Sequence, residues 1–368
     1  MHYSLLVALE IPEIIEDQAE NQKVEKCLEE LKEAYKQYSE NWVLEMQIRR
    51  LSGLTTEFAR TVAYEVGKIM ESYDAYPEDP KYLKFDDRTE QLKEAYLNNT
   101  IDCIRLPNGT ILKSIDLQKN FVIADGKISQ TYAGPLHHMK RTKKSKKMMA
   151  LIAYPYAKLF KTFEEYAEDR GVSFNEKKDR YGYWYNPNEM WDEYSIGGRW
   201  ADMFLVKDTC TEFSLGKRSW WNSKKEYEVP EGYMWVCAAR KKDIDWKRMR
   251  EWNVQKITKH YEKLKHMFEA NKMDGRYRGY ITDKGIFDCG ECAYRKGESL
   301  EEFMQRRGTP KEWRHPRYFH DIVDKNDWQC VDDFRDNAEQ QKSWHTILDE
   351  YIDSLSDDTV LVGVDYHI

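Results

Sequence analysis

Long hydrophobic segments are missing from this sequence of 368 residues. A transmembrane helix needs about 20 consecutive apolar residues, and no stretch approaches that length. The first residues are also not a basic stretch followed by an apolar one, which is the pattern of a secretory signal. We therefore expect a protein of the cytoplasm that makes no contact with a membrane.

Cysteine is scarce, and its seven residues are scattered along the chain. An odd, scattered set indicates reduced thiols in a cytosol and not a disulfide framework. Cys289 and Cys292 form the one close pair, and zinc would need two further ligands. The next histidines, His315 and His320, follow at a longer interval than a standard zinc finger allows. A tight turn with two thiols is the simpler interpretation, so we expect neither a bound metal nor a cofactor.

The sequence fingerprints of common nucleotide enzymes are also absent. Gly197 and Gly198 lack the lysine of a phosphate-binding loop and the third glycine of a dinucleotide-binding loop. There is no nucleophile elbow, and no tight acidic cluster of the kind that two-metal nucleases use. Acid/base catalysis would require the fold to bring together distant residues, namely Glu189, Asp192, Glu193 and His367. We therefore expect binding, and we keep catalysis as an alternative.

Charge is abundant, whereas apolar residues are not in excess. Charged residues make up 33% of the chain, the mean hydropathy is −0.84 and the net charge is −7. A negative net charge gives no general attraction to nucleic acid, so we do not expect nucleic acid as a partner. Much of the core must come from the 25 Tyr, 13 Phe and 12 Trp residues.

The order of apolar patterns predicts an α+β fold. An apolar strand at each end of the chain encloses alternating strands and helices, so both terminal strands are expected side by side in one sheet. The predicted sheet is central, mainly antiparallel and covered by helices. The predicted parts are an α+β body over residues 1–11 and 101–368, and a helical insertion over residues 12–100.

Residues 181–200 combine aromatic, Gly, Asn and Pro residues more densely than any other stretch of this length. The segment 186–188 predicts a turn, because Pro fixes φ and Asn tolerates left-handed backbone. Gly197 and Gly198 predict a second break. Arg199 lies beside Trp200, where its guanidinium could stack on the indole or bind a phosphate or carboxylate.

Two interpretations of this stretch remain open. It forms either a rigid structural corner, with Asp192 and Arg199 paired internally, or the wall of a pocket for a planar anionic ligand. The candidate ligand-binding residues are Trp184, Tyr185, Asn186, Asn188, Trp191, Asp192, Tyr194, Arg199 and Trp200.

Residues 140–147 are the strongest local positive run in this acidic chain. Most charge runs are solvated surface loops, and that interpretation applies here. The alternative is a clamp for the phosphates of a ligand. The candidate residues for such a clamp are Lys140, Arg141, Lys143 and Lys144.

Four segments together resemble a family of phage and prophage proteins of unassigned function. They are the first strand (His-Tyr-x-Leu-Leu-Val, residues 2–7), the stretch 181–200, the segment 242–246 and the last strand (Leu-Val-x-Val-Asp-x-His-Ile, residues 361–368). Tyr366 departs from the family pattern, which has Cys there, and Glu193 replaces an aromatic residue. The resemblance implies a viral protein that works in the cytoplasm of a bacterial host, and it carries no activity or catalytic residue.

Three functions follow from these features. The first is a counter-defence protein that binds and sequesters a small anionic, nucleotide-like signal of bacterial immunity. The second is an enzyme that degrades or modifies such a signal, with Glu189, Asp192 or His367 as acid or base. The third is an interaction protein whose helical insertion docks onto a host defence protein. The same insertion is also a candidate surface for a homo-oligomer.

Overall fold

The structure is a computed structural model, and it describes residues 1–12, 14, 17–38, 41–105, 109–113, 121–124, 127–130, 150–200, 202–210, 228–274, 279–288, 291–307, 314–323, 327–331 and 344–368. The chain divides into two compact units. The first unit is Met1–Ala75 with Asn188–Ile368, and the second is Tyr76–Pro187. The helical stretch expected over residues 12–100 is thus shared between the two units.

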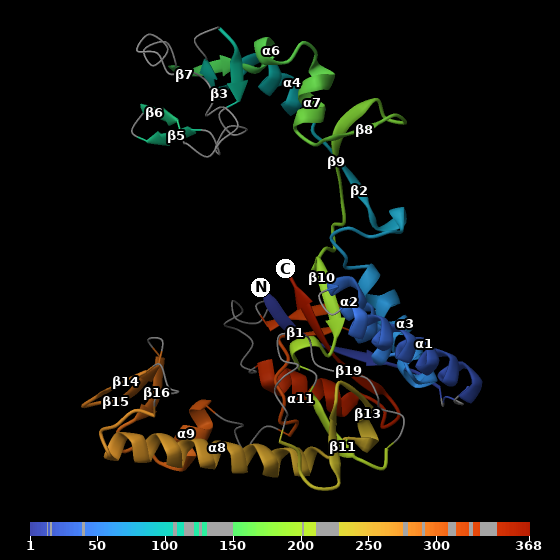
Figure 1. Ribbon diagram of the computed structural model, residues 1–368, viewed down its shortest axis with the longest axis vertical. Helices are drawn as coiled ribbons and strands as arrows, with labels where there is room; N and C mark the ends of the chain where they lie inside the picture. Colours follow the sequence, from blue (N-terminus) through green and yellow to red (C-terminus); the bar gives the residue numbers. More distant parts are fainter. Residues whose placement is uncertain are drawn as a thin grey trace. The chain divides into compact units, whose positions relative to one another are not determined.

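A mixed sheet is the centre of the first unit (Figure 1). Among its described strands, β1 and β17 pair in parallel, and the other pairings are antiparallel. The two terminal strands pair along their whole length, so the α+β fold expected from the sequence is confirmed. In order across the sheet, the strands are β10 (Glu193–Ile196), β19 (Val360–His367), β1 (His2–Leu9), β17 (Asp321–Val323) and β18 (Trp328–Cys330), with β13 (Ala238–Arg240) on the far part of β19.

The two central strands are buried on both faces over most of their length. β1 is buried from Ser4 to Leu9, and β19 from Val360 to Tyr366. Near-continuous apolar runs rich in β-branched residues are typical of strands that are covered on both sides. The polar residues of these strands gather at one end, where β1 begins and β19 ends.

Helix α3 (Glu57–Glu71) packs against β1. Its buried residues Phe58, Val62, Val66 and Met70 repeat every four residues, so they form one apolar stripe. Thr56 caps the helix by accepting a hydrogen bond from the amide of Ala59 at 3.1 Å. The preceding helices are α1 (Gln18–Gln37) and α2 (Trp42–Ser52).

The extended segment Tyr233–Arg240 is divided into two strands at Cys237. Its first part, β12 (Tyr233–Val236), pairs with β11 (Phe204–Lys207), and its second part is β13 in the central sheet. The Cys237 carbonyl accepts a hydrogen bond from the amide of Gly363 at 2.7 Å. One segment thus links the central sheet to a two-stranded sheet beside it.

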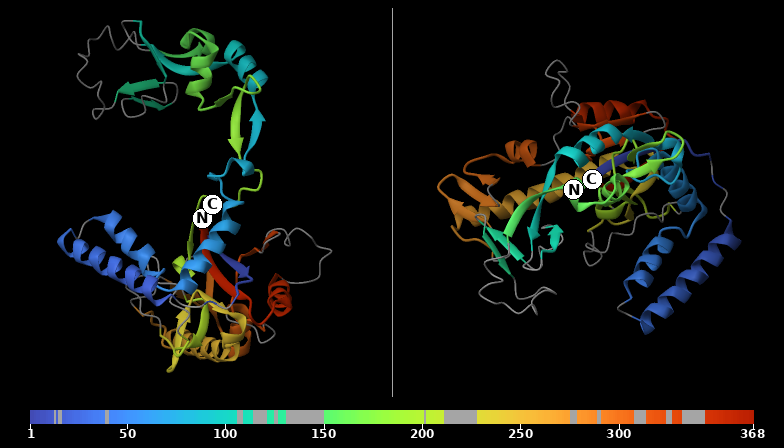
Figure 2. Two further views of the ribbon diagram at one scale, coloured as in Figure 1. Left: turned by 90° about the vertical axis from the view of Figure 1, so that its right-hand side faces the viewer. Right: turned by 90° about the horizontal axis from the view of Figure 1, so that it is seen from above.

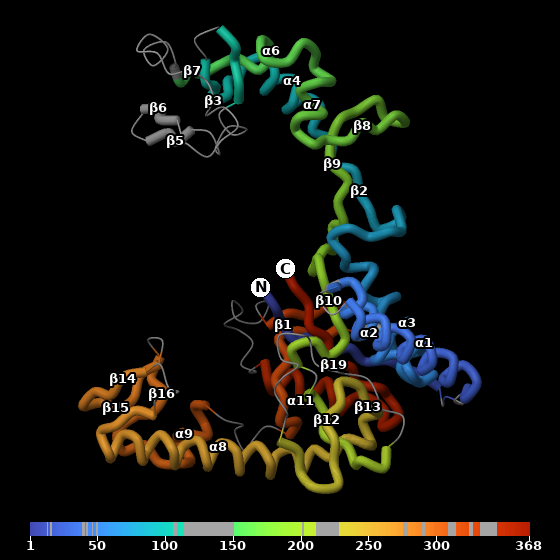
Figure 3. The backbone as a smooth tube through the Cα atoms, viewed as in Figure 1, coloured from blue at the N-terminus to red at the C-terminus, as the bar shows by residue number. Residues whose placement is uncertain are grey.

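Helix α8 (Trp246–Glu269) begins after Asp245, which caps it by accepting a hydrogen bond from the amide of Arg248. Helix α9 (Leu300–Arg307) begins with a capping box, in which the side chains of Ser299 and Glu302 each accept a hydrogen bond from the other residue's amide. These helices pack with β14 (Tyr280–Thr282), β15 (Gly285–Asp288) and β16 (Glu291–Arg295) around a second, smaller core (Figure 3). Helix α11 (Trp344–Ser354) packs into the main core.

The second unit contains three small sheets and three helices among its described residues. The sheet strands are β2 (Lys84–Asp87), β9 (Arg180–Tyr185) and β8 (Ser173–Asn175); β4 (Ile111–Lys113), β3 (Thr100–Arg105) and β7 (Ala150–Pro155); and β5 (Phe121–Ala124) with β6 (Lys127–Gln130). The helices are α4 (Thr89–Asn98), α6 (Tyr156–Leu159) and α7 (Phe163–Asp169). Ring contacts among Tyr96, Tyr156, Phe163 and Tyr166 hold the helices together. No helix in the described parts of either unit has the length and apolar character needed to cross a membrane.

Candidate functional site

The central stretch of the sequence does not form one corner. The boundary between the two units falls between Pro187 and Asn188, so Trp184, Tyr185 and Asn186 belong to the second unit and the rest to the first. Trp184 is half exposed and packs against Phe85 of the paired strand, with ring centroids 5.1 Å apart. Tyr185 is exposed, whereas Asn186 is buried.

Two of the expected ligand-binding rings lie in the core of the first unit. Trp191 is buried, and its indole Nε1 donates a hydrogen bond to the Met70 carbonyl of α3 at 2.9 Å. Tyr194 makes an edge contact with Trp191, and its hydroxyl lies against Gly67 of α3. For these two residues the structural-corner interpretation describes their surroundings. Asn188 is exposed, and Trp200 is partly buried against the same core.

Asp192 forms a hydrogen-bonded pair with a histidine that is 175 residues away in the sequence. Its carboxylate lies 2.8 Å from Nδ1 of His367, the second-last residue of the chain. This hydrogen bond holds the pKa of Asp192 below its usual value. Both side chains are accessible, with 45% of Asp192 and 37% of His367 exposed. The fold therefore brings together two members of the acid/base set considered above.

A second pair of the same kind lies beside the first. Nδ1 of His2 is 3.0 Å from a carboxylate oxygen of Asp365, which is buried, whereas the imidazole is 31% exposed. The other Asp365 oxygen accepts a hydrogen bond from the backbone amide of Arg199 at 2.9 Å. Asp365 thus fixes both the His2 ring and the turn that carries Arg199.

The two pairs share one face of the central sheet. In an antiparallel sheet, directly opposite residues project to the same face. His2 is opposite His367, and His367 is also opposite Glu193 across the next strand. Their two imidazole rings are 5.0 Å apart between centroids, at an interplanar angle of 61°. We call this group the histidine face; it comprises His2, Asp192, Glu193, Arg199, Asp365 and His367.

Gly198 allows the turn before Trp200 to approach Asp365. Its φ is +50°, which favours glycine, and an added Cβ would lie 2.4 Å from the Asp365 Cβ. The short 3₁₀ turn Gly198–Trp200 can therefore donate the Arg199 amide to the carboxylate. Arg199 is exposed, and within the described chain its guanidinium has no hydrogen-bond or ion-pair partner.

Three segments that are far apart in the sequence meet here. His2 comes from β1, Asp365 and His367 from β19, and Asp192 and Arg199 from the segments flanking β10. These strands are neighbours, and the two chain ends lie side by side in every view (Figures 1 and 2). The pairing of the terminal strands was the available signal for this site, because it places His2 next to His367.

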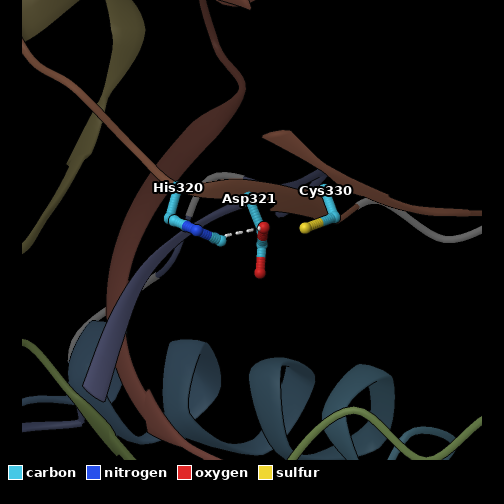
Figure 4. Close-up of side chains that lie close together, drawn as sticks. All are labelled: His320, Asp321 and Cys330. Atoms are coloured by element: carbon cyan, nitrogen blue, oxygen red, sulfur yellow. Dashed lines mark hydrogen bonds and ion pairs between the residues drawn. The ribbon is translucent and has the colours of Figure 1, made fainter. Parts of the chain in front are cut away.

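A second cluster of potential metal ligands lies on the opposite face of the sheet (Figure 4). One ligand atom each from His320, Asp321 and Cys330 lie within 4.8 Å of one another. Asp321 is fully buried and surrounded by donors, namely the Tyr366 hydroxyl, Trp328 Nε1 at 3.3 Å and a His320 ring nitrogen at 2.8 Å. Burial, followed by the Asp321 charge, raises the pKa of Tyr366. This carboxylate is already satisfied by core hydrogen bonds.

Among the described residues, those considered above as zinc ligands do not meet at one site. Cys292, His315 and His320 each contact a different group. The Cys292 thiol donates to the Tyr294 carbonyl, His315 pairs with Asp353 at 2.9 Å, and His320 pairs with Asp321. Cys289 lies outside the described residues, as do Lys140, Arg141, Lys143 and Lys144 of the basic run.

Comparisons with protein-family models, with curated proteins and with solved structures give no match. The resemblance to phage proteins therefore stays a prediction, and the geometry of the histidine face is the remaining indication of function.

Proposed function

We propose that the histidine face binds a small anionic, nucleotide-like ligand and hydrolyses a phosphoester bond in it. One observation carries the proposal: two neighbouring histidines are each held at Nδ1 by a carboxylate on an accessible face, where one of these carboxylates also accepts the backbone amide of Arg199. A histidine oriented in this way is the usual group for activating water in enzymes.

The free nitrogens of both rings are available for chemistry. Within the described residues, Nε2 of His2 and Nε2 of His367 have no hydrogen-bond partner. About a third of each side chain is exposed, so a ligand can reach these atoms from solvent. Histidine–carboxylate pairs can also be purely structural. Here, however, two such pairs lie side by side with their rings partly exposed and with Nε2 unbonded among the described residues, so they contribute little to the core.

The reaction needs water as its second substrate. Water attacks phosphorus, the bond from phosphorus to the leaving oxygen breaks, and the proton given up by water is balanced by one taken by the leaving oxygen. An oriented imidazole activates water either by accepting its proton or by holding a metal ion to which the water is bound. The Arg199 guanidinium is suited to bind the phosphate oxygens in a forked arrangement.

The resemblance to phage proteins suggests which ligands to examine first. A phage protein that cleaves a nucleotide signal of bacterial immunity would act against host defence. The sequestering function expected from the sequence uses the same ligand class and differs in one respect, since the ligand is released intact. The structure favours cleavage because it gathers His2, His367, Asp192 and Asp365.

The test is incubation of the full chain with bis(p-nitrophenyl) phosphate and with a panel of cyclic and linear dinucleotides, followed by chromatography of the products. We expect cleavage of at least one compound, and a loss of about 10²–10⁴-fold in the His2→Asn and His367→Asn variants. His266→Asn is the matched control, because His266 is an exposed residue of α8. Calorimetry with the same panel measures binding separately.

The outcomes separate the candidate functions. A ligand that binds and is recovered intact would support sequestration and overturn hydrolysis. Cleavage that persists in both histidine variants would place the reaction elsewhere in the chain. If the protein neither binds nor cleaves any compound of the panel, the proposed ligand class is wrong.

A further inference from the structure

The two histidines of the histidine face have the second contact that is typical of metal ligands. In protein metal sites, a ligating histidine binds the ion through one ring nitrogen and donates the other N–H to a carboxylate. His2 makes this contact with Asp365 at 3.0 Å, and His367 makes it with Asp192 at 2.8 Å. Acceptance by the carboxylate puts the proton on Nδ1 and leaves the Nε2 lone pair for an ion.

The spacing of the rings agrees with a shared ion. A zinc ion lies about 2.1 Å from a ligating nitrogen, hence about 3.2 Å from the ring centre, and tetrahedral ligands then place two ring centres about 5.2 Å apart. The observed separation of the His2 and His367 centroids is 5.0 Å. Direct cross-strand pairing produces this spacing, because the two residues are opposite each other on β1 and β19.

The charge of the face also favours a cation. Asp192, Glu193 and Asp365 supply three carboxylates, against the Arg199 guanidinium and the Met1 ammonium, whose charge reaches Asp192. A divalent ion would offset this negative charge and would let an anionic ligand approach. Glu193 is exposed and stands next to His367 in the same row of the sheet. Glu193 and His2 lie on opposite sides of His367 and form no three-ligand group with it, so the two imidazoles would be the protein ligands, and water or the bound anion would fill the other positions.

We infer that His2 and His367 bind one divalent transition-metal ion through Nε2, with zinc as the best match. This inference rests on the same face as the proposed function and deepens it. A bound ion would lower the pKa of its water and so supply the hydroxide that attacks phosphorus, while the leaving oxygen would take up the proton that the water gives up. Asp192 and Asp365 act as positioning residues, since they orient the two rings.

The test uses the full chain without a purification tag, stripped with EDTA and dialysed. Zinc binding is measured by calorimetry, and cobalt binding by visible absorption. We expect one ion per chain, with affinity reduced at least 100-fold in His2→Asn and His367→Asn. Asp192→Asn and Asp365→Asn should reduce affinity by about 10–100-fold, as for other residues that orient ligands. His266→Asn should not change it.

A competing site is examined in the same series. Cys330→Ser removes a ligand from the buried cluster of His320, Asp321 and Cys330 without touching the histidine face. Loss of the ion in that variant, with retention in His2→Asn and His367→Asn, would assign the metal to the buried cluster and overturn the inference. A cobalt–thiolate absorption band in the unmodified protein would point the same way.

Two further measurements distinguish loss of the metal site from loss of folding and identify the ligand atoms. Circular dichroism shows whether each variant is folded, and long-range ¹H–¹⁵N spectra of the unmodified protein show directly whether zinc shifts the Nε2 signals of two histidines. Unshifted histidine signals at saturating zinc would overturn the inference. Cleavage that continues in EDTA would leave the proposed function standing without the ion, whereas zinc binding without cleavage of any compound would do the reverse.

Discussion

Asp321 and Asp365 are both buried carboxylates of the same sheet, and they show two different roles that a buried carboxylate can have. Asp321 is fully buried on the face covered by α3, where Tyr366 and Trp328 donate to it from the core. Asp365 is 5% exposed on the other face, where it holds the accessible His2 and the amide of Arg199. Burial of the two carboxylates is alike, but their donors differ.

That difference separates a structural carboxylate from a positioning one. A carboxylate whose donors are all buried stabilises the fold, because removing it leaves those donors unsatisfied. A carboxylate whose donor extends to solvent fixes the direction of a group that can meet a ligand. The three predictions below concern this contrast between the two faces.

The largest expected effect is on stability when the core carboxylate is removed. Asp321→Ala leaves the Tyr366 hydroxyl and Trp328 Nε1 buried without an acceptor, so the free energy of unfolding should fall by about 3–5 kcal/mol. Asp365→Ala is the comparison, and it should cost about 1–2 kcal/mol, because His2 can turn to solvent. Urea denaturation measures both. Equal losses for the two variants would remove the distinction between the faces.

An intermediate effect is expected at Gly198. Gly198→Ala places a methyl group against Asp365 at a residue with φ of +50°, so we expect a loss of about 2–3 kcal/mol in the free energy of unfolding. Gly232→Ala is the matched control, because Gly232 has φ of +75° and open space around an added Cβ. Its cost should be about 1 kcal/mol, from the backbone alone.

The excess at Gly198 measures the close approach of the turn to Asp365. Zinc affinity of Gly198→Ala should fall as well, since the clash displaces the carboxylate that orients His2. Equal costs at Gly198 and Gly232 in urea denaturation would show that the turn adapts without disturbing Asp365.

The smallest effect concerns acid stability through the exposed pair. The hydrogen bond from His367 lowers the pKa of Asp192 below its usual value of 3.8, so the folded state holds the charged carboxylate more firmly than the unfolded state does. The pair therefore contributes stability above about pH 4, and this contribution is lost as the pH falls through the lower folded-state pKa. Because both groups are exposed, the contribution is small.

Asp192→Asn should accordingly be slightly less stable than the unmodified protein at pH 5, and the difference should vanish towards pH 2. Urea midpoints at pH 5, 4, 3 and 2 provide the measurement, with Asp283→Asn as an exposed control outside the pair. A difference that is constant with pH would show that the pair does not stabilise the fold by this mechanism.

Local features of the fold were predictable because they depend on neighbouring residues. Asp245 and the pair Ser299 and Glu302 mark helix starts through hydrogen bonds that span three residues, and the structure contains both. The apolar runs at the two chain ends likewise predicted β1 and β19. The division of the chain at Pro187 was not foreseen, since it depends on which distant segments pack together.

The candidate site shows the same limit. Trp191, Asp192 and Tyr194 are close in sequence and appeared to form one surface. Packing separates them: Trp191 and Tyr194 pack against α3, while Asp192 pairs with His367 on the other side. Alternation along a strand would place Asp192 and Tyr194 on the same side, but Asp192 lies before β10, so its direction depends on tertiary contacts.

The sequence by itself determined that two apolar strands close the chain at either end, with helices between them and a mainly antiparallel sheet at the centre. It did so because apolar periodicity and capping residues act over a few positions. Only the tertiary structure decided that His2 and Asp365 join Asp192 and His367. Their contacts span up to 363 positions of the chain, and such contacts exist only once the terminal strands have paired.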